Sequence, residues 1–362
     1  MFGSLQIGIA MILKLLENME ALKKYEVNDM KEKMWSILVH LSMNQWQAYV
    51  EESFEEGFDE TFWDYILQEA PKAGINAIVL DVGDGIQYAS HPEISQKGAW
   101  TRNRVRSEVI RCRELGIELI PKLNFATTHS FWQHEYRKMT SSTPYYKMAA
   151  DLIKEVAELF DHPSYIHLGM DEESAFFAKM HEYAIFRQGK QYWHDLRFLV
   201  DCVYDAGSKP WIWSNALFEF TEEYKKHFAV DEIVLSPYFY RAVKKEHWTP
   251  ITERQIWVEW YKKPDYAGMN IQYCEQDPIN VKFFNNALPR ANEGYLFMPC
   301  ASTVHDCEYN TYELVEYFKN GAPDESILGY QTAPWCKTIW EGKEAYDKSF
   351  KLLKEAKEAF YK

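Results

Sequence analysis

The stretch Tyr165-Ile166-His167-Leu168-Gly169-Met170-Asp171-Glu172-Glu173 is an apolar, strand-like run that ends in a small residue and three consecutive carboxylates. Ionised groups at the end of a buried strand are costly, because desolvation disfavours the charged form and like charges raise one another's pKa. One of these acids is therefore a candidate proton donor. The acids could equally cap a following helix, whose N-terminus favours negative charge. The motif alone leaves both interpretations open, so its surroundings decide between them.

Outward from this motif, strand signals alternate with helical ones from Trp35 onward, and eight such rounds follow one another. The strands are short and apolar, as expected for parallel strands that are covered on both faces. Helix start and stop signals lie between them, such as Asp59 before one helix and Gly74 after it. The predicted strands are 37–43, 77–82, 117–123, 165–169, 210–214, 233–238, 294–301 and 327–331, and an amphipathic helix over 342–361 closes the series.

Eight βα rounds predict an α/β fold of the (β/α)8 TIM-barrel class. The alternative, a doubly wound open sheet that binds a nucleotide, lacks a Gly-rich fingerprint after its first strand. We expect an N-terminal helical extension over residues 1–34 and one barrel domain over residues 35–362. The long connection over 248–292 could fold over the barrel mouth.

Composition excludes several classes of partner. The formal net charge of −14, without a long Lys/Arg cluster, argues against nucleic acid. The six cysteines lack CxxC spacing, and neither HxH nor HExxH occurs, so we expect no metal and no cofactor. The apolar run over 2–16 is too short for a membrane span and lacks a positively charged start. The sequence therefore predicts a cytoplasmic location, although it leaves secretion open, and it does not give the oligomeric state.

In a barrel, residues at the carboxyl ends of the strands converge on one face, where chemistry is expected. Those positions carry carboxylates, amides and aromatic rings, a set that suits sugars because polar groups bind hydroxyls while ring faces stack on pyranose C–H groups. Tryptophans there could instead plug the barrel, and His167 could be a buried hydrogen-bonding partner. Besides Asp171 and Glu172, the candidate substrate-binding residues are Asp84, Asn124, His129, His167, Trp213, Asn215, Tyr238, Gln331 and Trp335.

Residues 167–172 resemble the H-x-G-G-D-E signature of the family 20 glycoside hydrolases, the β-N-acetylhexosaminidases, with Met170 in place of the second glycine. Residues 120–124 followed by His129 are similar to that family's third-strand motif. Residues 327–331 with Trp335 resemble its last strand, and residues 213–215 fall where it places another sugar-facing tryptophan. The resemblance covers residues 35–340, but only the Asp-Glu motif is specific.

The resemblance implies a function for each acid. Glu172 would be the general acid that protonates the glycosidic oxygen, and Asp171 would hold the 2-acetamido group of a terminal N-acetylhexosamine. The carbonyl of that group attacks the anomeric carbon in this substrate-assisted, retaining route, so no enzyme nucleophile is needed. Trp213 and Trp335 would wall the sugar, and Tyr309 would be the tyrosine that helps to hold the acetamide.

The chain departs from the family in ways that leave other functions open. No arginine lies in 43–45, where the family grips distal hydroxyls, and Lys122 and Asn124 replace two third-strand carboxylates. The alternatives are a non-catalytic carbohydrate-binding barrel and a divergent glycosidase of other sugar specificity. Two conventional mechanisms also remain: a retaining one with Asp306 or Glu308 as nucleophile, and an inverting one with Asp81 or Asp84 as base.

Overall fold

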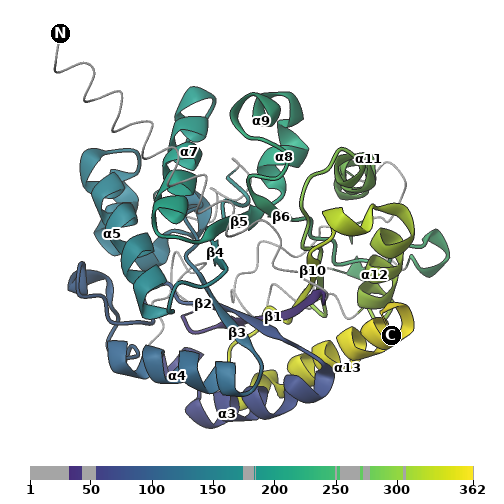
Figure 1. Cartoon of the computed structure of the whole chain (residues 1–362), viewed down its shortest axis with the longest axis horizontal. Coiled ribbons are helices and arrows are strands. Elements are labelled where there is room, and N and C mark those ends of the chain that lie inside the picture. The colour runs from purple at the N-terminus through teal and green to yellow at the C-terminus, as the bar shows by residue number, and fades with distance from the viewer. Residues whose placement is uncertain are drawn as a thin grey trace. The chain divides into compact units, whose positions relative to one another are not determined.

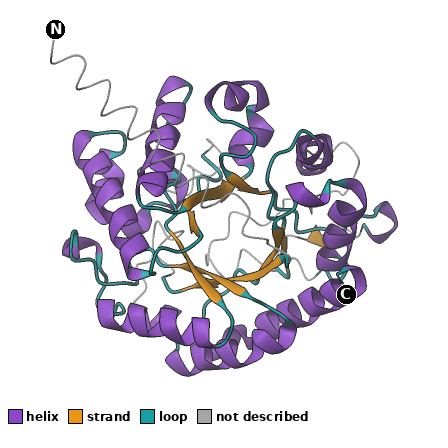
Figure 2. Cartoon of the chain, in the orientation of Figure 1, coloured by secondary structure: helices purple, strands orange, loops and turns teal. Residues whose placement is uncertain are grey.

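The computed structural model describes residues 32–42, 54–173, 183, 185–248, 251–252, 270–271, 278–304 and 307–361. From Met34 onward the chain forms one compact unit built on eight parallel strands, with helices outside them (Figures 1 and 2). The predicted helical extension over 1–34 lies outside the described residues, except for residues 32–34. Met34 itself begins the first strand.

The eight strands follow one another around the sheet in the order β6-β5-β4-β3-β2-β1-β10-β9. The sheet closes because the Leu235 N–H donates to the Leu296 carbonyl and the Cys300 N–H to the Pro237 carbonyl, both at 2.9 Å. This closure confirms the predicted barrel and excludes the open sheet. The strands are β1 Met34–His40, β2 Ala77–Asp81, β3 Glu118–Lys122, β4 Tyr165–His167, β5 Lys209–Trp213, β6 Val234–Ser236, β9 Cys300–Ser302 and β10 Gly329–Ala333.

Helices connect each strand to the next and form the outer layer (Figure 2). Asp59 begins α3 as predicted, because its carboxylate accepts the N–H groups of Thr61 and Phe62 at 2.7 and 3.0 Å. The α-helices are α2 Phe54–Gly57, α3 Glu60–Glu69, α4 Arg102–Glu114, α5 Thr143–Leu159, α7 Lys190–Asp205, α8 Asn215–Glu219, α9 Thr221–His227, α11 Pro278–Asn292, α12 Asn310–Gly321 and α13 Lys343–Phe360. Short 3₁₀ helices cover Pro71–Ala73, Pro92–Ile94, Thr127–His129, Phe131–Met139, Lys245–His247, Asp324–Ser326 and Trp340–Gly342.

Alternation along each strand creates two cores. In β1, Trp35 and Ile37 face the helices, whereas Leu38 belongs to a second cluster formed inside the barrel. Trp211 and Trp213 of β5 belong to the same inner cluster. Side chains therefore fill the barrel interior, and any site must lie at its rim.

The structure departs from the predicted strand bounds chiefly at two strands. The first strand lies at 34–40 rather than 37–43, so its carboxyl end is His40. The strand predicted at 294–301 is shorter and later, at 300–302. Of the long connection over 248–292, the described part contains a short antiparallel pair, β7 Ile251–Thr252 with β8 Asn270–Ile271, and α11. Within the described ranges no helix combines the length and apolar character needed to cross a membrane.

Candidate active site

The segment after β4, which carries the consecutive acids, has an unusual backbone. Gly169, Met170 and Glu172 all have left-handed conformations, with φ of 71°, 64° and 57°. A Cβ at residue 169 would lie 2.0 Å from Oδ1 of Asn124, so only glycine fits there. Non-glycine residues in this region are uncommon and are concentrated at functional sites.

Asp171 is nearly buried, with 9% of its surface exposed, and is surrounded by donors. Asn124 Nδ2 donates to its Oδ1 at 2.9 Å, and His129 Nε2 lies 3.4 Å from its Oδ2. Burial would raise the pKa of Asp171, but His129, Lys122 and Asn124 together hold it well below its ordinary value. Asp171 is therefore an anion at any pH near neutrality.

Glu172 has the opposite character although it is the next residue. Its side chain keeps 25% of its surface exposed, and His129 Nε2 lies 3.2 Å from its Oε2. Burial raises the pKa of Glu172 above the ordinary value, and the neighbouring Asp171 adds to this, while His129 partly opposes it. The pKa values of these two neighbouring carboxyls are therefore shifted in opposite directions, a pattern typical of a general acid beside a permanent anion.

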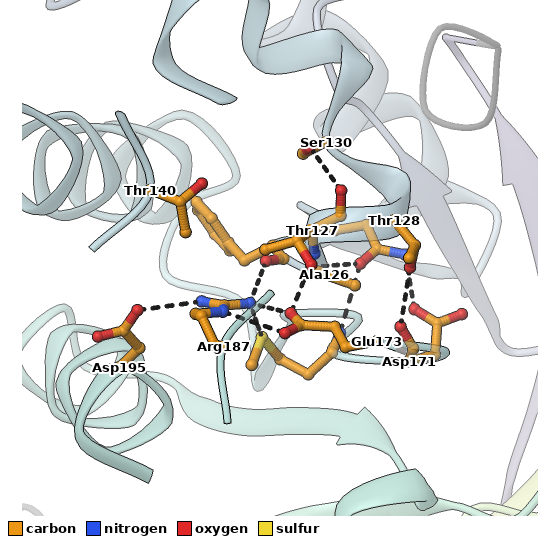
Figure 3. A network of polar contacts seen from close by, with 12 residues as sticks. Ala126, Thr127, Thr128, Ser130, Thr140, Asp171, Glu173, Arg187 and Asp195 are labelled. Atoms are coloured by element: carbon orange, nitrogen blue, oxygen red, sulfur yellow. Dashed lines mark hydrogen bonds and ion pairs between the residues drawn. The ribbon is translucent and has the colours of Figure 1, made fainter. Parts of the chain in front are cut away.

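His129 links the two acids. It lies in the 3₁₀ helix Thr127–His129, whose Thr128 hydroxyl donates to the backbone carbonyls of Asp171 and Glu172 at 3.4 and 3.2 Å (Figure 3). Burial alone would lower the pKa of His129, but the charges and hydrogen bonds of the two acids raise it to about 10. His129 is therefore a cation near neutral pH.

These three residues also offer the ligand atoms of a possible metal site, since one nitrogen and two carboxylate oxygens lie within 4.8 Å of one another. A metal would have to displace the proton that the two acids hold on His129, because only neutral imidazole is a ligand. Hydrogen bonds from a protonated His129 to the two carboxyls are an alternative reason for the three side chains to lie close together.

A second polar group lies inside the barrel, below this site. His40, Asp81, Lys122 and His167 are neighbours in strand register across β1 to β4. Asp81 Oδ2 lies 3.1 Å from His40 Nδ1 and 2.7 Å from Lys122 Nζ, and these side chains are at most 1% exposed. Burial opposes ionisation of Asp81, but Lys122 and His40 hold its pKa below the ordinary value.

Two predicted site residues are engaged inside the protein. Burial lowers the pKa of His167 to about 3, and its Nδ1 accepts the Gly169 N–H at 3.0 Å. The neutral imidazole thus shapes the turn that carries the acids. Asp84 is fully buried and pairs with His134 at 3.3 Å and with Ser42 and Gln96.

Aromatic residues form the other side of the mouth. The ring of Trp213 lies 5.6 Å from that of Tyr238 and 5.8 Å from that of Trp335, which also stacks on His40 at 5.7 Å. Trp213 and Gln331 are each 1% exposed, yet the indole N–H and both amide atoms have no hydrogen-bond partner among the described residues. Such groups are rare inside a protein unless a ligand or water binds them.

Beside Glu172 lies a hollow of about 190 Å³ whose wall includes Asn215, Tyr238 and Phe283. Asn215 Nδ2 donates to the Tyr238 hydroxyl at 3.1 Å, whereas its Oδ1 is buried and has no partner among the described residues. Lys282 and Glu219 also line the hollow, and Lys282 Nζ pairs with Glu219 at 2.8 Å. The hollow therefore combines apolar walls with donors and acceptors for hydroxyl groups.

The structure thus brings most of the predicted site residues to one end of the barrel, in two groups. Tyr309 differs, because it is 50% exposed and its ring stacks on His247 at 3.8 Å, not on any residue around the acids. Two residues near the site were not predicted from the sequence: His40, which the shift of β1 places at the strand end, and Arg187, which pairs with Glu173 behind the acids. No sequence motif marks Arg187, because it is a single charged residue in the segment between β4 and α7.

Neither a protein-family model nor a curated protein sequence matches the chain. Solved structures with a similar fold include the β-N-acetylhexosaminidase from Bacteroides fragilis (12% identity, TM-score 0.56, 90% of this chain and 65% of that one). Dispersin B is similar at 11% identity and a TM-score of 0.55, over 90% of this chain and 98% of that one. The GH20 β-N-acetylhexosaminidase from Streptomyces coelicolor has 11% identity and a TM-score of 0.53, over 88% of this chain and 63% of that one.

These similarities concern the fold, which resembles the barrel of family 20 β-N-acetylhexosaminidases, in agreement with the resemblance in the sequence. The chain spans less than two thirds of the Bacteroides fragilis and Streptomyces coelicolor proteins. At such low identity, function rests on the geometry of the site.

Proposed function

We propose that this protein is a glycoside hydrolase that removes terminal N-acetylhexosamine by substrate-assisted, retaining catalysis. Glu172 is the general acid and Asp171 holds the 2-acetamido group. The observation that carries the proposal is that the pKa values of two consecutive carboxyls around His129 are shifted in opposite directions, upward for Glu172 and downward for Asp171. A similar division between two carboxyls recurs in glycosidases.

The proposed chemistry follows from this difference between the two carboxyls. Glu172 gives its proton to the glycosidic oxygen as the bond to the anomeric carbon breaks, and the acetamide carbonyl oxygen of the substrate bonds to that carbon. Asp171 accepts the acetamide N–H and stabilises the positive charge that spreads over the resulting ring. Glu172, now a carboxylate, takes a proton from the water that opens this ring, which restores the acid and releases the sugar with retained configuration.

The aromatic side of the mouth supports sugar as the ligand. Tyr238 and Trp335 are partly exposed and offer ring faces to C–H groups, while the indole N–H of Trp213 and the amide of Gln331 lie behind them with unused hydrogen-bonding capacity. The hollow beside Glu172 extends this surface past the acid.

The conventional mechanisms have less support. Glu308 is a surface residue, with 79% of its side chain exposed, and lies 4.0 Å from Lys348, while Asp306 lies outside the described residues. Asp81 and Asp84 are fully buried and paired, so neither is poised to activate water.

A carbohydrate-binding barrel without catalysis is the second candidate. Lys122, which replaces a family carboxylate, turns into the barrel and pairs with Asp81, so it does not reach for a sugar hydroxyl. Fewer polar side chains are then left to bind the sugar. This is expected of a protein that binds carbohydrate but no longer cleaves it.

Hydrolysis of aryl N-acetyl-β-hexosaminides tests the proposal. Glu172→Gln is expected to lower kcat by about 10²- to 10⁴-fold for poor leaving groups and far less for good ones, which need little protonation. Because the acid must be protonated, kcat/KM of the unaltered protein falls as pH rises through the raised pKa of Glu172.

Glu308→Gln is the matched control, because Glu308 is an exposed glutamate. Equal turnover by this variant is expected, whereas its loss would favour a conventional nucleophile. Binding of N-acetylglucosamine without turnover on any aryl glycoside would favour the binding module.

A further inference from the structure

Arg187 is a buried cation that lies directly behind the acid pair. Its Nε donates to Glu173 Oε2 at 3.2 Å, its Nη2 donates to the other oxygen of that carboxylate, and the same Nη2 lies 2.8 Å from the Phe125 carbonyl. Its Nη1 reaches Asp195 at 3.4 Å. Figure 3 shows the guanidinium between the Glu173 and Asp195 carboxylates.

The partners of Arg187 come from three separate segments. Phe125 follows β3, Glu173 follows Asp171 and Glu172 beyond β4, and Asp195 lies on α7. Glu173 Oε1 also accepts the Thr127 N–H at 3.0 Å, so the ion pair is bonded to the short helix that carries His129. The Arg187–Glu173 pair thus joins the two segments that place His129 next to the acids.

The outer end of this arrangement is firmly held. The Asp195 carboxylate accepts hydrogen bonds from the Ser141 hydroxyl at 2.6 Å, the Tyr146 hydroxyl at 2.6 Å and Gln191 Nε2 at 2.7 Å. Because these donors belong to α5, α7 and the turn before α5, Arg187 is fixed to the outer helical layer. A planar guanidinium suits this task, since it can bond several acceptors in one plane.

The turn that carries the acids needs such support. Met170 and Glu172 adopt left-handed backbone conformations, which persist only where the surroundings hold them. The turn has further contacts with the β3 side. Asn124 bonds Asp171 at 2.9 Å and the Met170 N–H at 3.3 Å, and the Thr128 hydroxyl bonds the carbonyls of Asp171 and Glu172 at 3.4 and 3.2 Å. His129 contacts the two carboxyls at 3.4 and 3.2 Å, so most of these contacts are long.

We propose that Arg187, through Glu173, is a positioning residue that sets the distance between His129 and the carboxyls of Asp171 and Glu172. It touches no reacting atom. For its kinetic consequence this inference rests on the proposed hydrolase function, but its structural consequence at His129 does not. Misplacement of a catalytic group by about 1 Å can cost roughly 100-fold in rate.

Arg187→Met removes the guanidinium and keeps only an apolar stem, whereas Arg187→Lys keeps the positive charge but loses the planar, forked donor group. On an aryl N-acetyl-β-hexosaminide with a poor leaving group we expect kcat to fall roughly 10- to 100-fold in the Met variant and less in the Lys variant, with a smaller change in KM. NMR titration of the His129 ring gives the second readout. Its pKa, raised to about 10 by Asp171 and Glu172, should fall toward the ordinary value when the three side chains separate.

Arg102→Met is the matched control. Arg102, the first residue of α4, pairs through Nη1 with the nearly buried Glu155 of α5 at 2.8 Å, and that carboxylate also accepts the Ala89 N–H of the loop after β2. None of these residues contacts the acid pair among the contacts described. Some loss of stability is expected there, without a change in kcat or in the His129 titration.

A double variant separates positioning from stability. Arg187→Met combined with Glu173→Gln leaves no unpaired glutamate charge, so thermal stability should partly recover while kcat and the His129 titration stay altered. Recovery of all three together, or an unchanged His129 titration in Arg187→Met, would overturn the proposal. Absence of turnover in the unaltered protein would instead overturn the hydrolase function, and the His129 titration would still decide the role of Arg187.

Discussion

At the ends of β1 to β4 the inward side chains are His40, Asp81, Lys122 and His167, whereas β5 and β10 present Trp213 and Gln331. In the first half of the barrel the ionised groups bind one another. In the second half aromatic rings pack together, and the Trp213 N–H and Gln331 amide keep hydrogen-bonding capacity that no described residue uses.

This difference indicates that the two halves of the barrel contribute to the site in different ways. Paired charges below the acids fix protonation states, because Lys122 contributes to the lowered pKa of Asp171 and also to that of His167. Uncharged aromatic groups with spare donors suit the side that receives a neutral ligand. A ligand that met the charged half instead would have to break buried ion pairs, which is costly.

We expect the largest effect on stability when one charge is removed from the paired groups inside the first half of the barrel. Lys122→Met leaves Asp81 buried with only the neutral His40 beside it, so we expect a loss of about 3–5 kcal/mol in the free energy of unfolding. Urea denaturation measures it. Lys138→Met removes an exposed lysine that pairs with Glu135, and we expect almost no change there. A loss below about 1 kcal/mol for Lys122→Met would mean that water reaches the interior pair.

Asp171→Asn tests the negative charge that lies between the two halves of the barrel. The amide keeps the shape but loses the negative charge that should stabilise the cyclic intermediate, so kcat should fall about 10²- to 10³-fold. Steady-state hydrolysis of an aryl N-acetyl-β-hexosaminide measures the effect. Asp161→Asn is the control, because that carboxylate is 66% exposed and pairs with a surface arginine. Equal rates for Asp171→Asn and the unaltered protein would remove Asp171 from the mechanism.

Trp213→Phe tests the aromatic half. The change removes the buried indole N–H and part of the ring surface, and we expect the Kd for N-acetylglucosamine to rise roughly tenfold. Calorimetric titration measures this binding. Trp193→Phe serves as the control, since Trp193 of α7 is also buried but stacks on His227 in the outer layer. Equal weakening in both variants would show that the loss comes from packing rather than from ligand contact.

Local sequence patterns predicted the barrel because each strand is a short apolar run between helix signals. They placed β1 three residues late, since the apolar run over 34–43 contains no breaker that marks the strand end. The acids, Asn124 and His129 were predicted together because strand ends converge in a barrel. The partners of Lys122 and Arg187 could not be predicted, because strand register and a long connection bring them together from distant positions.

The smallest effect is the pH dependence that His129 gives to stability. Its pKa is raised to about 10 in the folded protein, above the ordinary value, so its contribution is complete below pH 6.5 and is lost as pH rises through 10. In His129→Gln the melting temperature should therefore fall by about 2 °C at pH 6, for a loss of about 1 kcal/mol, and by much less near pH 10.5. Scanning calorimetry at both pH values measures the difference in melting temperature between the unaltered protein and the variant.

A difference that is the same at both pH values would mean that His129 is neutral between the acids. In that case a divalent cation that raises the melting temperature of the unaltered protein, but not that of the variant, would favour a metal site.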